Sequence, residues 1–227
     1  GRVKTRLCEE LSGAEAAALY AEMLADRCAQ VARLADVVPA ITYASAAIDD
    51  GVTDAPKGFQ VIRQPPGDLG VGLSTAAEHF LSRGLPVLLV DSDSVTLPID
   101  YLEMALELFR AKPNDSLTDA PDVVVGPCED GGYYLLGLRR FFPQLFVDIP
   151  WSSPRVAETT IRRARVLGLG VSVLPTWWDV DTPSDLRRLR RDLALASWPP
   201  RTAAWLRARE VAGLDGERRG QKGKPDA

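Results

Sequence analysis

The stretch Leu85 to Val90 constrains the fold more than any other part of the sequence. Its residues, LPVLLV, are apolar without alternation, so a strand there would be buried on both faces. Such a strand is typical of the centre of a parallel sheet that helices cover on both sides. It runs directly into Asp91-Ser92-Asp93-Ser94. In open α/β sheets ligands bind where the strands end, so we expect these acids at a functional edge.

Strands and helices alternate along the rest of the chain. The expected strands cover residues 37–43, 59–62, 85–90, 122–125, 133–138 and 171–174, and the expected helices cover residues 12–34, 71–83, 99–111, 154–167, 183–195 and 200–212. This order predicts a three-layer α/β fold with a mainly parallel central sheet. We expect a single domain over residues 1–212 and a disordered, charged and Gly-rich tail over residues 213–227.

Composition excludes several classes of partner. The 227 residues carry a net charge of −4 and a pI of about 5.2, which gives no global field for nucleic acid or anionic membrane. No apolar run approaches the roughly 18 residues that span a membrane. The three cysteines form no metal-binding pair with one another or with His79, the single histidine. We therefore expect reduced thiols and a cytoplasmic protein with no nucleic-acid or membrane partner.

The segment from Asp91 to Pro98 is the first with chemical potential. Carboxylates at a sheet edge suit Mg²⁺ or Mn²⁺, which prefer oxygen ligands and retain waters and substrate phosphates. The same residues also suit a capped turn, in which Asp and Ser bind loop amides before the helix that follows Pro98. Spacing alone does not separate these two interpretations.

A second pair of acids, Asp179 and Asp181, follows two tryptophans. Asp181 is a candidate second metal ligand from another strand end. Helix capping explains the neighbouring Thr182 and Pro183 well. It does not explain two acids directly after two tryptophans.

Three further segments carry polar groups suited to a ligand. Glu129 to Gly132 joins two acids to two glycines, which let a backbone approach a ligand closely, although a hairpin turn explains Asp130-Gly131 nearly as well. Trp151 to Arg155 is typical of a helix start with an arginine in reach of an anion, although helix capping alone is the better explanation of Ser153. Lys4 and Arg6 would neutralise a diphosphate, although such surface pairs are common.

Together these segments resemble a known bacterial family. Six stretches match in family order, namely GRVKTRL at 1–7, GDLG at 67–70, SDSVTLP at 92–98, GPCEDGGYY at 126–134, PWSSP at 150–154 and DVDTP at 179–183. The sequence is similar to the uncharacterised glycosyltransferase-like proteins with the GT-A nucleotide-sugar fold that are often described as arsenosugar-biosynthesis glycosyltransferases. It resembles the molybdenum-cofactor and phospholactate nucleotidylyltransferases more distantly.

The resemblance implies a role for each residue that matches the family pattern. The implied residues are Lys4, Arg6, Asp68 and Gly70 for the nucleotide and its phosphates, Asp93 and Asp181 for Mg²⁺ or Mn²⁺, Glu129 and Asp130 for catalysis, and Gly131, Gly132, Trp151 and Ser152 for the substrate.

The sequence departs from the family pattern in four places. Asp91 stands where the family usually has Gly, and Val95 stands where it usually has Pro. Val71 and Gly72 occupy the stretch where an Arg is expected. The family begins with a strand and a loop before the GRVK segment, and this sequence contains neither. We therefore expect a GT-A fold that lacks its first strand.

The resemblance implies a metal-dependent glycosyltransferase that moves a sugar from a nucleotide-diphosphate sugar to a small-molecule acceptor. The alternative is a nucleotidylyltransferase, in which a phosphorylated acceptor attacks the α-phosphate of a nucleoside triphosphate. That reaction needs more cations than Lys4 and Arg6, and Arg63 and Arg155 are the further candidates. A third interpretation is a non-catalytic nucleotide-binding protein. The expected partners are a nucleotide sugar or a triphosphate and an acceptor, and a homodimer is left open.

Overall fold

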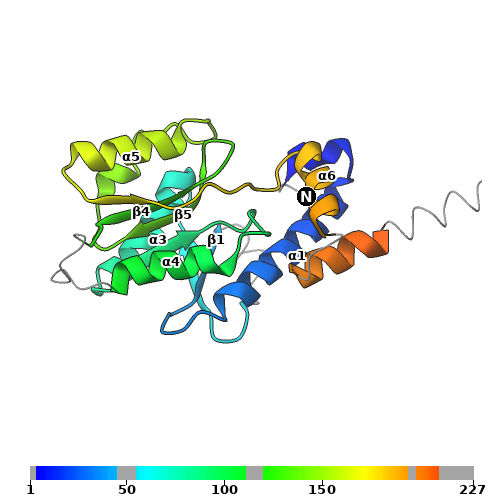
Figure 1. Ribbon diagram of the computed structural model, residues 1–227, viewed down its shortest axis with the longest axis horizontal. Helices are drawn as coiled ribbons and strands as arrows, with labels where there is room; N and C mark the ends of the chain where they lie inside the picture. The colour runs from blue at the N-terminus through cyan, green and yellow to red at the C-terminus, as the bar shows by residue number, and fades with distance from the viewer. Residues whose placement is uncertain (1–3, 45–54, 111–119, 194–197, 210–227) are drawn as a thin grey trace, which may run out of the picture. The chain divides into compact units, whose positions relative to one another are not determined.

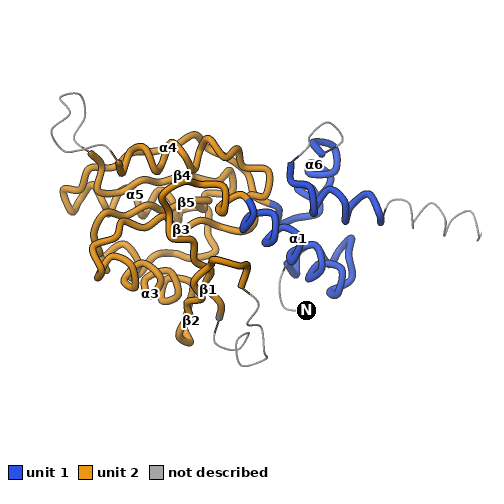
Figure 2. The backbone as a smooth tube through the Cα atoms, turned by 90° about the horizontal axis from the view of Figure 1, so that it is seen from below, with its two compact units in different colours: residues 1–29, 180–227 blue, residues 30–179 orange. Residues whose placement is uncertain are grey.

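The computed structural model describes residues 4–44, 55–110, 120–193 and 198–209 (Figure 1). The chain divides into two compact units (Figure 2). Unit 1 comprises residues 1–29 and 180–227, and unit 2 comprises residues 30–179. The tail over residues 213–227, for which the sequence predicts disorder, lies outside the described residues, and so does the start of the first matching stretch at 1–3.

Unit 2 contains two β-sheets. β1 (Ala40–Ala44) and β2 (Gln60–Gln64) pair in parallel. The second sheet has the order β3-β5-β4-β6 and consists of β3 (Val87–Val90), β5 (Tyr133–Leu138), β4 (Val123–Pro127) and β6 (Val171–Val173). β6 runs parallel to β4, whereas β5 runs antiparallel to both β3 and β4. β3, β4 and β6 therefore point in one direction and end at the same edge.

Helices cover both faces of the four-stranded sheet (Figure 1). They are α3 (Leu69–Leu81), α4 (Ile99–Arg110) and α5 (Val156–Val166). Successive residues of a strand face opposite sides, so β4 serves two cores. Val123 and Val125 pack with α3 and α5, whereas Val124 packs with α4. This arrangement confirms the predicted three-layer α/β fold.

β3 is shorter and more exposed than the sequence predicts. The strand begins at Val87, which is buried, and the three residues that follow are only half-buried. β3 stands at one end of its sheet, and its strand partner among the described residues is β5. The absence of alternation indicates two apolar faces, but it does not reveal how many edges of a strand are paired.

The ring of Tyr134 packs directly over Gly126 of the neighbouring strand β4. A Cβ atom on Gly126 would lie 2.3 Å from Cζ of Tyr134, so the ring occupies the space of a side chain at that position. The hydroxyl of Tyr134 donates to the carbonyl of Pro175 at 2.9 Å. This contact holds the segment after β6 against β5.

Unit 1 is helical in its described parts. It contains η1 (Thr5–Glu9), most of α1 (Gly13–Val31), α6 (Pro183–Leu193) and a helix over residues 200–209. The predicted capping box is confirmed, since Ser12 donates from N and Oγ to Glu15 at 2.7 Å. The buried carboxylate of Asp26 accepts from N and Oγ of Thr202, each at 2.8 Å, and so fixes the start of the last helix. Within the described ranges, no helix combines the length and apolar character that a membrane crossing needs.

Candidate functional site at the carboxyl edge of unit 2

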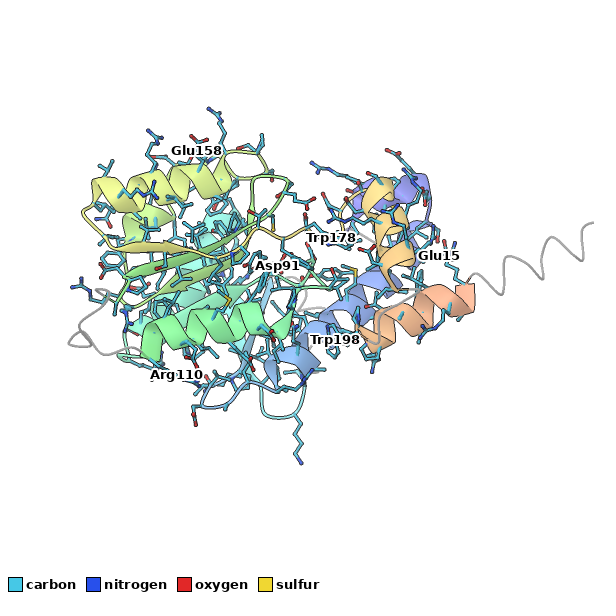
Figure 3. The ribbon with its side chains drawn as sticks, in the orientation of Figure 1. Glu15, Asp91, Arg110, Glu158, Trp178 and Trp198 are labelled. Carbon is cyan, nitrogen blue, oxygen red and sulfur yellow. The ribbon has the colours of Figure 1, made fainter. Side chains whose placement is uncertain are left out.

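Three chain segments meet where the parallel strands of unit 2 end. Because β3, β4 and β6 share one direction, the residues that follow them gather at one edge of the sheet. These residues are Asp91 to Ser94 after β3, Cys128 to Gly132 after β4, and Trp177 to Asp179 after β6. Figure 3 shows Asp91 at this end of the sheet. The edge is therefore rich in carboxylates.

Asp91 closes the turn that follows β3. Its Oδ2 atom accepts from Oγ of Ser94 at 2.7 Å and from N of Ser94 at 3.2 Å. Oγ of Ser92 donates to Oδ1 of Asp93 at 3.1 Å. The capped-turn interpretation therefore describes Asp91, whereas Asp93 is the carboxylate at this turn that the resemblance assigns to a metal.

The segment from Cys128 to Gly132 is a tight hairpin turn between β4 and β5. N of Cys128 donates to the carbonyl of Gly132 at 2.9 Å, and N of Gly131 donates to the carbonyl of Cys128 at 3.1 Å. Oδ1 of Asp130 accepts from N of Gly132 at 2.8 Å, which positions this exposed carboxylate. The hairpin interpretation of the sequence is confirmed.

Gly131 joins this turn to the start of α5. Its φ of 88° favours glycine, and a Cβ atom there would lie 2.1 Å from the carbonyl oxygen of Pro154. The carbonyl of Gly131 accepts from N of Ala157 at 2.9 Å. The predicted acidic loop and the predicted PWSSP segment are therefore in direct contact.

Trp151 lies against the first turn of α3. A Cβ atom on Gly70 would lie 2.6 Å from Nε1 of Trp151, so only glycine permits this approach. The Trp151 ring meets the ring of Tyr133 edge-on, with centroids 6.4 Å apart. The structure thus brings together Gly70 and Trp151, to which the family resemblance assigns roles in binding the nucleotide and the substrate. Ser152 follows with a strained φ of 61°.

Asp68 has a structural role in this structure. Its Oδ1 atom accepts from N of Val71 at 2.9 Å and caps the N-terminus of α3. The cap accounts for this residue type at position 68, and a contact to base or ribose stays a prediction.

Trp177 holds the segment after β6 beside the hairpin turn. Its N donates to the carbonyl of Pro127 at 3.0 Å, and its carbonyl accepts from N of Glu129 at 2.8 Å. Its indole Nε1 donates to Oγ1 of Thr96 at 3.2 Å. These three bonds link the segments after β3, β4 and β6, and they deliver Asp179 to the same edge.

Three side chains at this edge lie close enough together to be candidate metal ligands. Sγ of Cys128 and carboxylate oxygens of Asp130 and Asp179 all lie within 4.8 Å of one another. Cys128 is only 7% exposed. Burial, followed by the charges of Asp91 and Asp179, raises the pKa of the Cys128 thiol well above its ordinary value.

Sequence reasoning assigned no site role to Cys128 or Asp179. Asp179 carries a signal, since it follows two tryptophans without a capping role. Cys128 carries none beyond its position in the acidic turn. Its closeness to Asp179 depends on backbone pairing across residues that are 48 positions or more apart, which no local pattern reveals.

The predicted residues of unit 1 form a separate cluster. Nζ of Lys4 lies 3.4 Å from Oδ1 of Asp181, and Nη1 of Arg6 lies 2.8 Å from Oδ2. The Lys4 side chain is 5% exposed, and its φ of 54° is unusual for a residue with a Cβ atom. Both oxygens of Asp181 therefore face cations. Asp93, the other predicted metal ligand, belongs to unit 2.

Solved structures identify the fold. The structure is similar to that of a proposed nucleotide-diphospho-sugar transferase from Desulfovibrio desulfuricans G20, with a TM-score of 0.80 and 31% sequence identity over 93% of this chain and 90% of that protein. It is also similar in fold to CMP:2-keto-3-deoxy-manno-octonic acid synthetase complexed with CTP, with a TM-score of 0.52 and 16% identity over 76% of this chain and 87% of that one. No curated protein matches the sequence.

The sequence also matches a described family over more than half of its length. Residues 24–153 match DUF2064, whose description reads "Uncharacterized protein conserved in bacteria". The matched range includes Asp93, the hairpin turn and Trp151. The chain therefore belongs to the DUF2064 family and has the nucleotide-diphospho-sugar transferase fold.

Proposed function

We propose that this protein is a glycosyltransferase. It would move a sugar from a nucleotide-diphosphate sugar to a small-molecule acceptor. The observation that carries the proposal is the 31% identity, over nearly the whole chain, to a protein described as a proposed nucleotide-diphospho-sugar transferase. The carboxylates at the edge of unit 2 support it, because ligands of open α/β sheets bind where the strands end.

The donor phosphates are the proposed ligands of Lys4 and Arg6. Both side chains point at the carboxylate of Asp181, at 3.4 and 2.8 Å. A diphosphate offers the same cations more oxygens and more charge than one carboxylate does. Donor binding would therefore compete with Asp181 for the two side chains.

A divalent cation is the proposed cofactor, and the donor set at the edge of unit 2 suits one. Carboxylates of Asp91 and Asp93 directly follow the end of β3, and Mg²⁺ and Mn²⁺ prefer oxygen ligands. Asp93 is the proposed ligand in unit 2, whereas Asp181, to which the resemblance also assigns a metal role, belongs to unit 1 and pairs there with Lys4 and Arg6. A bound cation would neutralise charge on the departing diphosphate.

The acceptor would bind beside the hairpin turn. Glu129 and Asp130 are both exposed there, so either carboxylate could take a proton from an acceptor hydroxyl. Gly131 and Gly132 bring the backbone close to that position, and Trp151 supplies an aromatic face. These assignments follow the family pattern and the contacts described above.

Nucleotidylyl transfer is the second candidate. The fold is shared with a synthetase whose structure was solved with CTP, so the fold does not separate the two reactions. They differ in the donor, which is a sugar nucleotide in one case and a nucleoside triphosphate in the other.

Ligand-induced melting shifts test the proposal. We expect the full chain with Mn²⁺ to melt at a higher temperature with sugar nucleotides than with nucleoside triphosphates, because binding to the folded state stabilises it. Asp93→Asn is expected to remove the Mn²⁺-dependent part of the shift. Asp100→Asn, at an exposed position of the same unit, is the matched control and is expected to retain it.

The outcomes separate the candidate functions. A larger shift with triphosphates contradicts glycosyl transfer and supports nucleotidylyl transfer. No shift with either class of donor contradicts both reactions. An unchanged Mn²⁺-dependent shift in Asp93→Asn removes this residue from the metal site.

A further inference from the structure

The hairpin turn and the segment after β6 bring a thiol and two carboxylates to one point. Sγ of Cys128 and oxygens of Asp130 and Asp179 lie within 4.8 Å of one another. In tetrahedral geometry, with Zn–S at about 2.3 Å and Zn–O at about 2.0–2.2 Å, two ligand atoms on one zinc ion lie about 3.5 Å apart. Side-chain rotations that shorten these separations by about 1 Å would therefore close the group around a cation.

The backbone holds these ligands in place before any ion arrives. The backbone of Trp177 forms hydrogen bonds with Pro127 and Glu129, the residues on either side of Cys128. The two segments therefore form a parallel bridge at Cys128 and Trp177. N of Gly132 fixes the Asp130 carboxylate at 2.8 Å. A site built on paired backbone loses little conformational entropy when it binds an ion.

The groups around Sγ of Cys128 are better suited to a metal cation beside the sulfur than to a hydrogen bond donated to it. Oγ of Ser94 lies 3.9 Å from Sγ of Cys128, but the Ser94 hydroxyl donates its single proton to Asp91 at 2.7 Å. The charge of Asp91 therefore adds to those of Asp130 and Asp179 around a side chain that is 7% exposed. Negative charge gathered around a buried sulfur stabilises a metal ion there.

We propose that Cys128, Asp130 and Asp179 bind a divalent transition-metal ion that accepts sulfur, such as Zn²⁺ or Co²⁺. The thiol loses its proton to solvent as the sulfur–metal bond forms, so each ion bound releases one proton. Three protein ligands leave at least one coordination position for water or a substrate oxygen, as in catalytic rather than structural zinc sites. Asp130 is exposed and gives the ion its path of entry.

This site goes beyond the proposed transferase function and does not depend on it. The two share Asp130, so when the ion is bound to Asp130 the proposed role of base on the acceptor falls to Glu129. A sulfur ligand selects metals differently from a set of carboxylates alone, because Mg²⁺ binds oxygen and disfavours thiolate. The ligand set is also separate from Asp93 and Asp181, to which the resemblance assigns a role in binding Mg²⁺ or Mn²⁺.

Titration of the metal-free full chain with Co²⁺ tests the site without an activity assay. We expect a sulfur-to-cobalt charge-transfer band in the near-ultraviolet, which only thiolate ligation produces. Cys128→Ser is expected to abolish this band and to weaken Co²⁺ binding by at least about tenfold. Asp130→Asn and Asp179→Asn are expected to keep the band and to weaken binding by at least about tenfold each.

The other two cysteines provide matched controls. Cys28→Ser changes a thiol that is equally buried, and Cys8→Ser changes an exposed one, so both variants are expected to retain the band. Binding without a band, a band that survives Cys128→Ser, or no Co²⁺ binding overturns the proposal. Unchanged affinity in either aspartate variant overturns the ligand set.

A measurement on the unaltered protein covers the case in which Cys128→Ser does not fold. X-ray absorption of the zinc-loaded chain at one equivalent of Zn²⁺ is expected to show one sulfur neighbour at about 2.3 Å and oxygen neighbours at about 2.0–2.2 Å. A spectrum with oxygen neighbours alone overturns the proposal.

Discussion

The two units hold their carboxylates in different ways. In unit 1 several carboxylates pair with side-chain cations, and the pairs are Lys4 and Arg6 with Asp181, Arg187 and Arg190 with Glu10, Arg201 with Glu22, and Arg209 with Glu15. Asp26 and Asp185 of the same unit instead accept from backbone amides and hydroxyls. At the carboxyl edge of unit 2, backbone amides and hydroxyls hold Asp91 and Asp130. An ion pair cancels charge, whereas an amide or hydroxyl positions a carboxylate by hydrogen bonding. We therefore expect the removal of a carboxylate charge to weaken the fold more at the ion pairs of unit 1 than at the edge of unit 2.

A substitution that disturbs the backbone at the edge of unit 2 is expected to have the largest effect on stability. Gly131→Ala places a methyl group 2.1 Å from the carbonyl oxygen of Pro154 and forces a non-glycine residue to a φ of 88°. We expect it to lower the free energy of unfolding by about 3 kcal/mol, because overpacking and backbone strain act together. Urea denaturation measures the loss.

Gly84→Ala isolates the strain from the clash. Gly84 has a φ of 73°, but a Cβ atom there would have nothing within 4 Å. We expect a loss of only about 1 kcal/mol. Equal losses in the two variants would show that contact with Pro154 contributes nothing to the edge.

Alkaline pH is the next largest test, because the buried thiol at the edge lies beside carboxylates. The pKa of Cys128 is raised in the folded state, chiefly by burial, so folding keeps the proton that an unfolded chain loses. The stabilisation is complete below pH 9 or so and is lost as the pH rises further, by at most about 1.4 kcal/mol per pH unit. Urea denaturation of the chelator-treated protein at several pH values measures this slope.

Cys128→Ala is expected to flatten the alkaline loss more than Cys28→Ala does. Burial also raises the pKa of Cys28, but the nearby charge of Arg27 lowers it, whereas the carboxylates near Cys128 raise its pKa further. The burial of Tyr133 and Tyr134 raises the pKa of both phenols and leaves a remaining slope in either variant. If the free energy of unfolding of Cys128→Ala falls with rising pH as steeply as that of the unaltered protein, the alkaline loss does not come from the Cys128 thiol.

Removing one carboxylate charge from each unit has the smallest expected effect. Asp181→Asn weakens the contacts to Arg6 and to the buried Lys4, so we expect a loss of about 1 kcal/mol that shrinks in high salt. Asp130→Asn keeps an oxygen for N of Gly132, so the loss is expected to stay within about 0.5 kcal/mol. Thermal melts of both variants at low and high salt measure the difference, and a larger loss in Asp130→Asn would reverse the comparison.

Local features of the fold could be predicted from the sequence, and long-range ones could not. The Ser12–Glu15 capping box and the cap that Thr182 forms with Asp185 depend on residues three positions apart, and both are present. The antiparallel direction of β5 could not be predicted, because it depends on which strands β5 pairs with. The one local indication was a hairpin turn at Asp130-Gly131, and the sequence also allowed a ligand-binding loop there. The three-layer order followed from alternation of strands and helices, which the chain retains.

The candidate site could be predicted only in part for the same reason. The strand-end rule located the acids after β3 and after the tryptophans, because those positions follow directly from the chain. The pairing of Trp177 with Pro127 and Glu129 brings Asp179 to Cys128, and this pairing joins residues about fifty positions apart. The contact between Gly70 and Trp151 is likewise tertiary, and no local pattern around Gly70 indicates its partner.

The ring of Tyr134 that occupies the place of a side chain at Gly126 has a consequence for how this sequence can change. The two positions share one volume, so neither can be substituted without regard to the other. A larger residue at 126 requires a smaller one at 134, and that change also deprives Pro175 of its hydrogen-bond donor. Relatives that lack the glycine should therefore differ at both positions at once, and single exchanges should be far less tolerated than the double exchange.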